Sequence, residues 1–132
     1  MPNLTAWAPR VLSLLRIMSG LLYLEHGTQK MLNFPIPGPG AEGGPLPPMV
    51  MASGILELVL GVLIALGLFT RPAAFIASGH MAAAYFIAHA AQGPWPAGNG
   101  GDAAILYCFV FLYLVFAGAG PWSLDAIVRK KT

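Results

Sequence analysis

Long apolar runs, separated by short polar or proline-rich segments, dominate this sequence. As helices rising about 1.5 Å per residue, four runs are long enough to cross a hydrocarbon core of about 30 Å. These runs cover residues 8–32, 48–69, 72–91 and 102–117. We therefore predict an all-α fold, an integral membrane four-helix bundle. Because the links between the runs are short, residues 1–132 are expected to form a single domain.

Two segments depart from this apolar pattern. Prolines and glycines crowd residues 33–48, which excludes a regular helix or central strand and predicts a loop that could fold over the mouth of the bundle. Near the C-terminus, Ser123 can cap a short amphipathic segment, 124–131, with Trp122 at the lipid headgroups. The pattern there predicts a short interfacial helix.

The first run carries a stripe of polar and small residues along one side. At about 100° per residue on a helix, its members fall within a sector roughly 100° wide. They are Arg16, Ser19, Gly20, Tyr23, His26, Gly27 and Lys30, whereas Glu25 points almost the opposite way. An ionisable group at bilayer depth costs a few kcal/mol, so such groups usually face a bundle interior or a wet cavity. The stripe is therefore the first indication of a functional site.

The second run places Glu57 near mid-membrane, on a face that it shares with Ser53, Gly54, Gly61 and Ile64. Glycines on that face would let a neighbouring helix approach closely. An unpaired Glu57 would be a proton carrier, and a paired one would be the counter-ion of Arg16 or a histidine. We predict that Glu57 faces the interior and hydrogen-bonds to the first helix, through Arg16, Tyr23 or His26.

The third run contains two histidines on different sides. His80 shares a face with Ala84 and Ile87, and His89 lies opposite with Ser78 and Tyr85. Two histidines that face opposite ways cannot serve one metal together, so we predict no metal site. Axial haem ligation by His26 and His89, or a metal held by histidines and Glu57, remains open as an alternative.

Composition agrees with the membrane prediction, since 57% of the residues are hydrophobic and only 9% are charged. A net charge of +2 gives no reason to expect nucleic acid as a partner. Cys108 is the only cysteine, which excludes an internal disulfide or a dithiol redox centre. No nucleotide-binding loop, catalytic triad or nucleophile elbow is visible, and whether the chain is an enzyme stays undecided.

The basic residues predict an orientation in the membrane. With four spans, one side carries Arg10, Arg71, Arg129, Lys130 and Lys131, and Lys30 alone flanks the other side. The positive-inside rule then places both termini in the cytoplasm.

Several motifs, in this order and covering nearly the whole chain, resemble the DoxX family of small four-helix membrane proteins. They are Arg16 followed by Glu25-His-Gly-Thr-Gln-Lys-Met-Leu32, Glu57 followed by Leu60-Gly-Val-Leu-Ile-Ala-Leu-Gly-Leu-Phe-Thr-Arg-Pro72, Asn99-Gly-Gly-Asp-Ala-Ala-Ile-Leu-Tyr107, and Phe116-Ala-Gly-Ala-Gly-Pro-Trp-Ser-Leu-Asp125. The family pattern of His-Gly-x-x-Lys, an acid in the second helix, and Gly-Gly-acid before the fourth is matched by His26, Gly27, Lys30, Glu57, Gly100, Gly101 and Asp102. The loop 33–48 departs from it.

The resemblance implies a multi-pass protein of the bacterial cytoplasmic (inner) membrane. Some DoxX relatives are subunits of a membrane thiosulfate:quinone oxidoreductase, others associate with thiol-redox or oxidative-stress systems, and many have no assigned activity. A quinone is therefore the cofactor that the resemblance suggests.

We expect His26 and Lys30, with Glu57 below and Asp102 across from them, to frame a cavity that opens to the outer leaflet. Gly27, Gly54 and Gly61 would leave space beside these side chains. Tyr23 and Arg16 complete the predicted ligand-binding set. The alternative for this end of the helix is that Lys30 extends to the outer surface and His26 bonds to another helix.

Two functions remain open at this point. The chain could be a non-catalytic membrane module that binds a small amphipathic ligand or a soluble redox partner, or a quinone-linked oxidoreductase subunit. Its partners would be the lipid bilayer and such a ligand or protein. The oligomeric state stays open, and a homo-oligomer would be needed for four helices to enclose a transport path.

Overall fold

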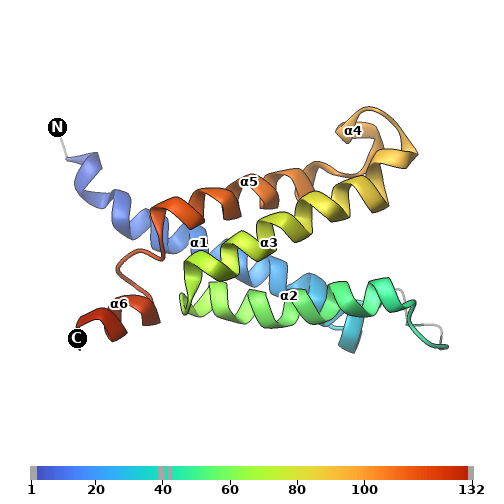
Figure 1. Cartoon of the computed structure of the whole chain (residues 1–132), viewed down its shortest axis with the longest axis horizontal. Helices are drawn as coiled ribbons and strands as arrows, with labels where there is room; N and C mark the ends of the chain where they lie inside the picture. The colour runs from blue at the N-terminus through green and yellow to red at the C-terminus, as the bar shows by residue number, and fades with distance from the viewer. Residues whose placement is uncertain (1–2, 39–40, 42, 131–132) are drawn as a thin grey trace.

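The computed structural model describes residues 3–38, 41 and 43–130, and within these ranges it is all-helical. Figure 1 shows the arrangement. The helices are α1 (Leu4–Leu32), α2 (Pro48–Leu66), α3 (Thr70–Ala84), the π-helical turn η1 (Tyr85–His89), the 3₁₀ turn η2 (Ala90–Gln92), α4 (Pro96–Asn99), α5 (Asp102–Ala117) and α6 (Leu124–Lys130). The predicted all-α membrane bundle with a short C-terminal helix is confirmed.

The helix ends follow from local sequence signals. Asn3 caps α1 through a bond from the Ala6 N–H to its side chain, and Pro48 begins α2 at the position where a helix tolerates proline. Gly67 ends α2 in the left-handed conformation, with φ of 71°. Ser123 accepts from the Ala126 N–H, which confirms it as the cap of α6.

Helices α1 and α2 pack closely through glycines. A Cβ atom added at Gly20 would lie 2.6 Å from the backbone nitrogen of Ala65, and one at Gly61 would lie 2.8 Å from the Cα of Leu24. Contacts this short mean that only the hydrogen of a glycine, and no side-chain carbon, fits at these two positions. The close approach predicted for the glycine face of the second helix is therefore what the structure shows at Gly61, and Gly20 adds a second such contact.

Helices α3 and α5 form the second pair. Their contact surface is made of small residues on α3, including the fully buried Ala74 and Ala77, against Phe111 and Leu114 of α5. The hydroxyl of Ser78 donates to the backbone oxygen of Cys108 across the pair, at 2.7 Å. The core of the bundle lies where this pair meets Tyr23 of α1 and Ile64 of α2.

The two pairs diverge toward the end of the bundle that lies opposite the termini (Figure 1). Both chain ends lie at the other end, which we call the closed end. An even number of spans puts the two chain ends on the same side. Arg16 secures the closed end: its Nη1 donates to the Ala119 oxygen at 2.8 Å and its Nη2 to the Trp122 oxygen at 2.7 Å. The buried guanidinium thus fastens α1 to the turn between α5 and α6.

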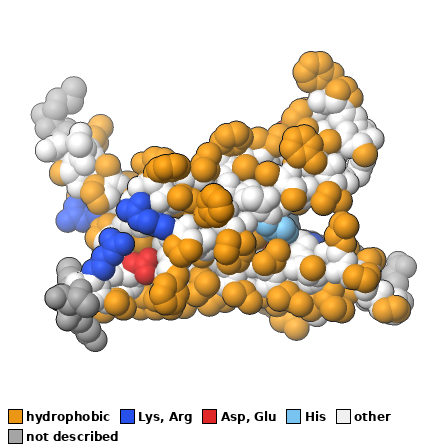
Figure 2. Space-filling model, viewed as in Figure 1, with side chains coloured by type: hydrophobic (Ala, Val, Ile, Leu, Met, Phe, Trp, Pro, Cys, Tyr) orange, Lys and Arg blue, Asp and Glu red, His pale blue; other side chains and the backbone are white. Residues whose placement is uncertain are grey.

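The exterior of the bundle is apolar, as Figure 2 shows for one face. Exposed fractions of 67% for Phe75, 71% for Phe86 and 63% for Phe109 are those of lipid-facing side chains. Two stretches, Pro48–Leu66 and Thr70–Gln92, are individually long and apolar enough to cross a membrane, and Asp102–Ala117 is a shorter apolar helix. Helix α1 is longer than these and more polar because of its stripe.

Candidate functional site

A cavity of about 770 Å³ lies between the diverging helix pairs. Residues from α1, α2, α3, η1 and α5 line it, and most of them are apolar. The polar or aromatic members of the lining are Tyr23, His26, Lys30, Ser53, Glu57, His80, His89 and Tyr107. Figure 2 shows histidine surface at the edge of the hollow between the two pairs. A mostly apolar cavity with a few convergent polar groups is typical of a ligand site.

Lys30 and Glu57 form an ion pair in the wall of this cavity. The Lys30 Nζ lies 2.6 Å from the Glu57 Oε1, and the Ser53 hydroxyl donates to the same oxygen at 2.8 Å. The Glu57 side chain is 2% exposed and that of Lys30 is 23% exposed. Lys30 therefore turns into the bundle, instead of extending to the outer surface, because a buried carboxylate lies within its reach.

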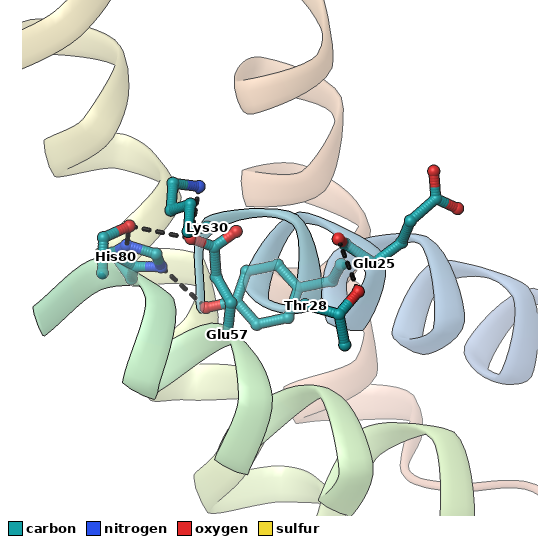
Figure 3. A network of polar contacts seen from close by, with 7 residues as sticks. Glu25, Thr28, Lys30, Glu57 and His80 are labelled. Carbon is teal, nitrogen blue, oxygen red and sulfur yellow. Dashed lines mark hydrogen bonds and ion pairs between the residues drawn. The ribbon is translucent and has the colours of Figure 1, made fainter. Parts of the chain in front are cut away.

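The polar contacts continue from Glu57 to Tyr23. The Ser53 oxygen lies 2.9 Å from Nε2 of His80, and Nδ1 of His80 lies 2.7 Å from the Tyr23 hydroxyl. Figure 3 shows how Lys30, Glu57 and His80 converge from three helices, while Glu25 and Thr28 lie on the far side of α1. Tyr23, His80, Ser53, Glu57 and Lys30 thus form one hydrogen-bond chain, which we call the polar chain.

With a neutral His80, the direction of each bond in the polar chain follows from the protons that each group carries. Ser53 has a single hydroxyl proton and gives it to Glu57, so its oxygen can only accept from His80. A neutral imidazole that donates from Nε2 has an unprotonated Nδ1, which accepts from Tyr23. Every donor in the chain then points toward the carboxylate of Glu57.

Aromatic rings form the wall around Tyr23. Its ring centroid lies 5.0 Å from Phe111 and 6.0 Å from Tyr107, and Tyr107 makes an edge contact with His26 at 6.0 Å. His26 itself is exposed and lines the cavity without a recorded hydrogen bond within the described ranges. Its ring nitrogens therefore remain available to a ligand.

The π-helical turn corrects the prediction that His80 and His89 face opposite ways. Because a π turn holds an extra residue compared with an α turn, Tyr85–His89 rotates the end of the third span, and both histidines line the cavity. His89 keeps its Nδ1 at 3.1 Å from the Asn99 backbone oxygen. In the part of the chain that the structure describes, no three His, Cys, Asp or Glu side chains come together as metal ligands.

Two residues of the predicted ligand-binding set lie elsewhere. Arg16 is buried at the closed end against Ala119 and Trp122, outside the cavity lining, so it is neither a cavity residue nor the partner of Glu57. Asp102 is exposed in the first turn of α5 and is also outside the lining. The structure brings together Tyr23, His26, Lys30 and Glu57.

The source of the cavity also differs from the prediction. Gly27, Gly54 and Gly61 do not line it, because each is covered by the neighbouring helix of the α1–α2 pair. A Cβ at Gly27, for example, would lie 2.8 Å from the Leu58 nitrogen. The space comes from the divergence of the two helix pairs instead.

Ser53 and His80 lie on the helix faces predicted for them, but neither was among the predicted site residues. Ser53 precedes Glu57 by four residues, a spacing that brings side chains together on a helix, so this link was readable from the sequence. The contact of His80 with Ser53 and Tyr23 joins three helices and depends on how they pack.

Comparison with known proteins agrees with the fold. Residues 11–90 match the DoxX family. The chain is 46% identical to an uncharacterized protein of Haemophilus influenzae, over 99% of this chain and 100% of the relative. It is 28% identical to an uncharacterized membrane protein of Mycobacterium tuberculosis, over 97% of this chain and 87% of the relative. No solved structure matches the chain. This protein is therefore a membrane protein that belongs to the DoxX family.

Proposed function

We propose that the chain is a membrane module that holds a small amphipathic molecule in the cavity between its two helix pairs, as an accessory component of a redox system. The observation that carries this proposal is the ion pair of Lys30 and Glu57 in the wall of a cavity of about 770 Å³. That volume lies within the usual range for small-molecule sites, about 300–1,000 Å³.

The polar chain favours a neutral head group on the ligand. Lys30 and Glu57 cancel each other's charge, so an anionic head would find no excess positive charge there. Both recorded bonds to Glu57 end on Oε1, and among the described residues no donor is recorded for Oε2. A hydroxyl can donate to that oxygen, and a carbonyl can accept from Lys30 or His26. The proposed head therefore carries carbonyl or hydroxyl groups.

The rest of the cavity suits an apolar body. Its wall includes Met49, Leu56, Met81 and Ile87, of which Leu56 is 36% exposed and Ile87 59% exposed. Side chains that line a cavity and also face lipid mark a route by which a membrane-dissolved molecule can enter. An isoprenoid or acyl chain attached to the polar head would lie along this route.

Mass spectrometry of the small molecules that remain bound through purification in mild detergent tests the proposal. Removing a charged hydrogen-bond partner should weaken retention about tenfold or more, so Glu57→Gln and Lys30→Gln should each lose the molecule that the native chain carries. Glu25→Gln is the matched control, because Glu25 is exposed on the far side of α1. Equal ligand content in the native chain and all three variants would mean that the polar chain does not bind the ligand.

A second candidate is a quinone-linked oxidoreductase subunit, and the direction of the polar chain favours it. Reducing a quinone requires protons at its carbonyl oxygens, and a chain of hydroxyl, imidazole and carboxylate groups is suited to move them. Tyr23, His80, Ser53 and Glu57 would serve as this proton path, and electrons would come from a soluble redox partner. Quinone in the extracted small molecules, reducible in the presence of that partner, would support this role.

A further inference from the structure

A second cleft, independent of the cavity, lies at the closed end of the bundle. Its volume is about 260 Å³, and it is formed where the start of α3, the turn after α5 and α6 meet. Its charged residues are Arg71, Asp125 and Arg129, and the remaining wall is small: Ala117, Gly118, Ala119, Gly120, Ser123 and Ala126. Figure 2 shows basic side chains gathered at this end around an acidic one.

Arg71 is held in place in the cleft but keeps donors available. Its Nη1 donates to the backbone oxygens of Val115 and Phe116, at 2.8 and 2.7 Å. Its Nη2 lies 3.0 Å from where a Cβ of Gly118 would be, so glycine at 118 lets the guanidinium lie against the turn. No bond from Nη2 or Nε is recorded within the described ranges. A planar guanidinium with such donors is suited to phosphate oxygens.

The carboxylate in the cleft is already engaged elsewhere. Asp125 Oδ1 accepts from the Phe69 N–H at 2.9 Å and Oδ2 from the Thr70 N–H at 3.0 Å, so both oxygens face the start of α3. Both oxygens of Asp125 are therefore occupied by backbone N–H groups, whereas Arg71 lines the cleft with Nη2 and Nε donors that an anion can use.

The position of the cleft at the ends of two apolar helices fits the depth of lipid headgroups. It is bounded by the ends of two membrane-spanning helices, and the adjacent Phe69, Phe116 and Trp122 are exposed by 64%, 75% and 51%. Large aromatic side chains at span ends are typical of the membrane interface. Basic pockets at this depth are places where anionic lipid headgroups bind.

We propose that this cleft binds the phosphate group of an anionic phospholipid, with Arg71 and Arg129 as its cationic contacts. The phosphate lies against the guanidinium of Arg71 and the glycine-rich turn 117–120, and the acyl chains run along the apolar outer surface beside Phe69 and Phe116. The bound lipid would hold α6 and the turn after α5 at the bilayer surface.

The test is native mass spectrometry of the full chain in detergent, titrated with phosphatidylglycerol, phosphatidylcholine or inorganic phosphate. We expect phosphatidylglycerol to bind in preference to phosphatidylcholine. Arg71→Gln and Arg129→Gln should each weaken its binding about tenfold, since each removes a charged hydrogen-bond donor. Arg10→Gln is the matched control: Arg10 lies over the Trp7 ring outside the cleft, and the substitution removes the same charge.

The outcomes separate the possible explanations. Equal binding of the two lipids, or equal loss in all three arginine variants, would overturn the proposal, because either result means that general charge attraction suffices. Phosphate binding that needs Arg71, without lipid selectivity, would support the anion chemistry and reject the lipid source. Arg71→Gln could fail to fold, because it leaves the backbone oxygens of Val115 and Phe116 without their donor. In that case Arg129→Gln and Arg71→Lys test the proposal. Arg71→Lys should weaken lipid binding, because lysine lacks the planar guanidinium that binds phosphate through two donors.

Discussion

At the scale of single residues, the pairing of Lys30 with Glu57 is the feature that most constrains the site. A carboxylate that is 2% exposed needs a compensating charge or proton, and the Lys30 Nζ and the Ser53 hydroxyl each lie within hydrogen-bond distance of its Oε1. Truncating either partner leaves the other without its bond in low dielectric. The polar chain is therefore expected to be a stability determinant as well as a binding site.

Glu57→Gln should destabilise the folded protein by about 2 kcal/mol, because it removes the charge that Lys30 faces. Thermal melting of the detergent-solubilised chain measures this change. Glu25→Gln changes the same group on an exposed surface and should melt like the native chain. Unchanged melting of Glu57→Gln would mean that the ion pair contributes nothing to folding.

The contribution of Asp125 to the stability of the fold should depend on pH. Burial acts to raise the pKa of Asp125, but the bonds from Thr70 and Phe69 and the charge of Arg129 outweigh it, so the pKa lies below its ordinary value. A depressed pKa stabilises the fold above the unfolded value of about 3.9 and loses that contribution as pH falls through the folded value. Asp125→Asn should therefore melt lower than the native chain at pH 6, and the difference should shrink below about pH 4.

At the scale of helices, periodicity predicted the elements and their buried faces. The buried residues of α1 include Arg16, Ser19, Tyr23 and Gly27 of the predicted stripe, and α5 has the predicted limits. Pairing across helices was less predictable. Lys30 reaches Glu57 because its flexible side chain turns inward, and Arg16 finds backbone carbonyls instead of a carboxylate. The partner of a long side chain depends on how the helices pack, and a single sequence does not show that packing.

The third span shows a second limit of periodicity. A pattern of one residue per 100° assumes an unbroken α-helix, and the π turn at Tyr85–His89 breaks that assumption and moves His89 to the cavity. No residue in that turn is a recognised signal for a π-helix. The face of His89 was therefore outside what the sequence alone could predict.

The glycines between α1 and α2 give a prediction at this scale. Gly61→Ala should destabilise the bundle by about 1–3 kcal/mol, because its methyl group would collide with the backbone of Leu24. Gly79→Ala is the matched control on α3, where an added Cβ meets nothing within 4 Å and alanine favours the helix. Melting temperatures of the two variants should move in opposite directions. A stable Gly61→Ala variant would contradict the close packing.

At the scale of the whole molecule, the proposed orientation places both termini in the cytoplasm and the cavity mouth toward the outer leaflet. The closed end contains the termini, and Arg10, Arg71 and Arg129 belong to it. The side chain of Lys130 and the whole of Lys131, also counted in the prediction, lie outside the described residues. The orientation stays a prediction from the basic residues.

Cysteine labelling tests this orientation. In a Cys108→Ala background, Ala41→Cys should react with a membrane-impermeant maleimide in right-side-out vesicles, and Asn3→Cys should react only in inverted ones. Ala41 lies in the loop between α1 and α2, at the opposite end of the bundle from Asn3. The reverse labelling pattern would place the cavity mouth on the cytoplasmic side.

The central claim is that the cavity between the helix pairs is occupied by a small molecule in the membrane. Filling the cavity without substituting any residue of the polar chain tests this most directly. Ala84→Phe projects a ring into the cavity, whereas Ala82→Phe places the same ring on a residue of α3 that is outside the lining. The measurement is the amount of bound small molecule per protein, by native mass spectrometry. We expect Ala84→Phe to lose the molecule and Ala82→Phe to keep it. Equal retention by both folded variants would contradict the account.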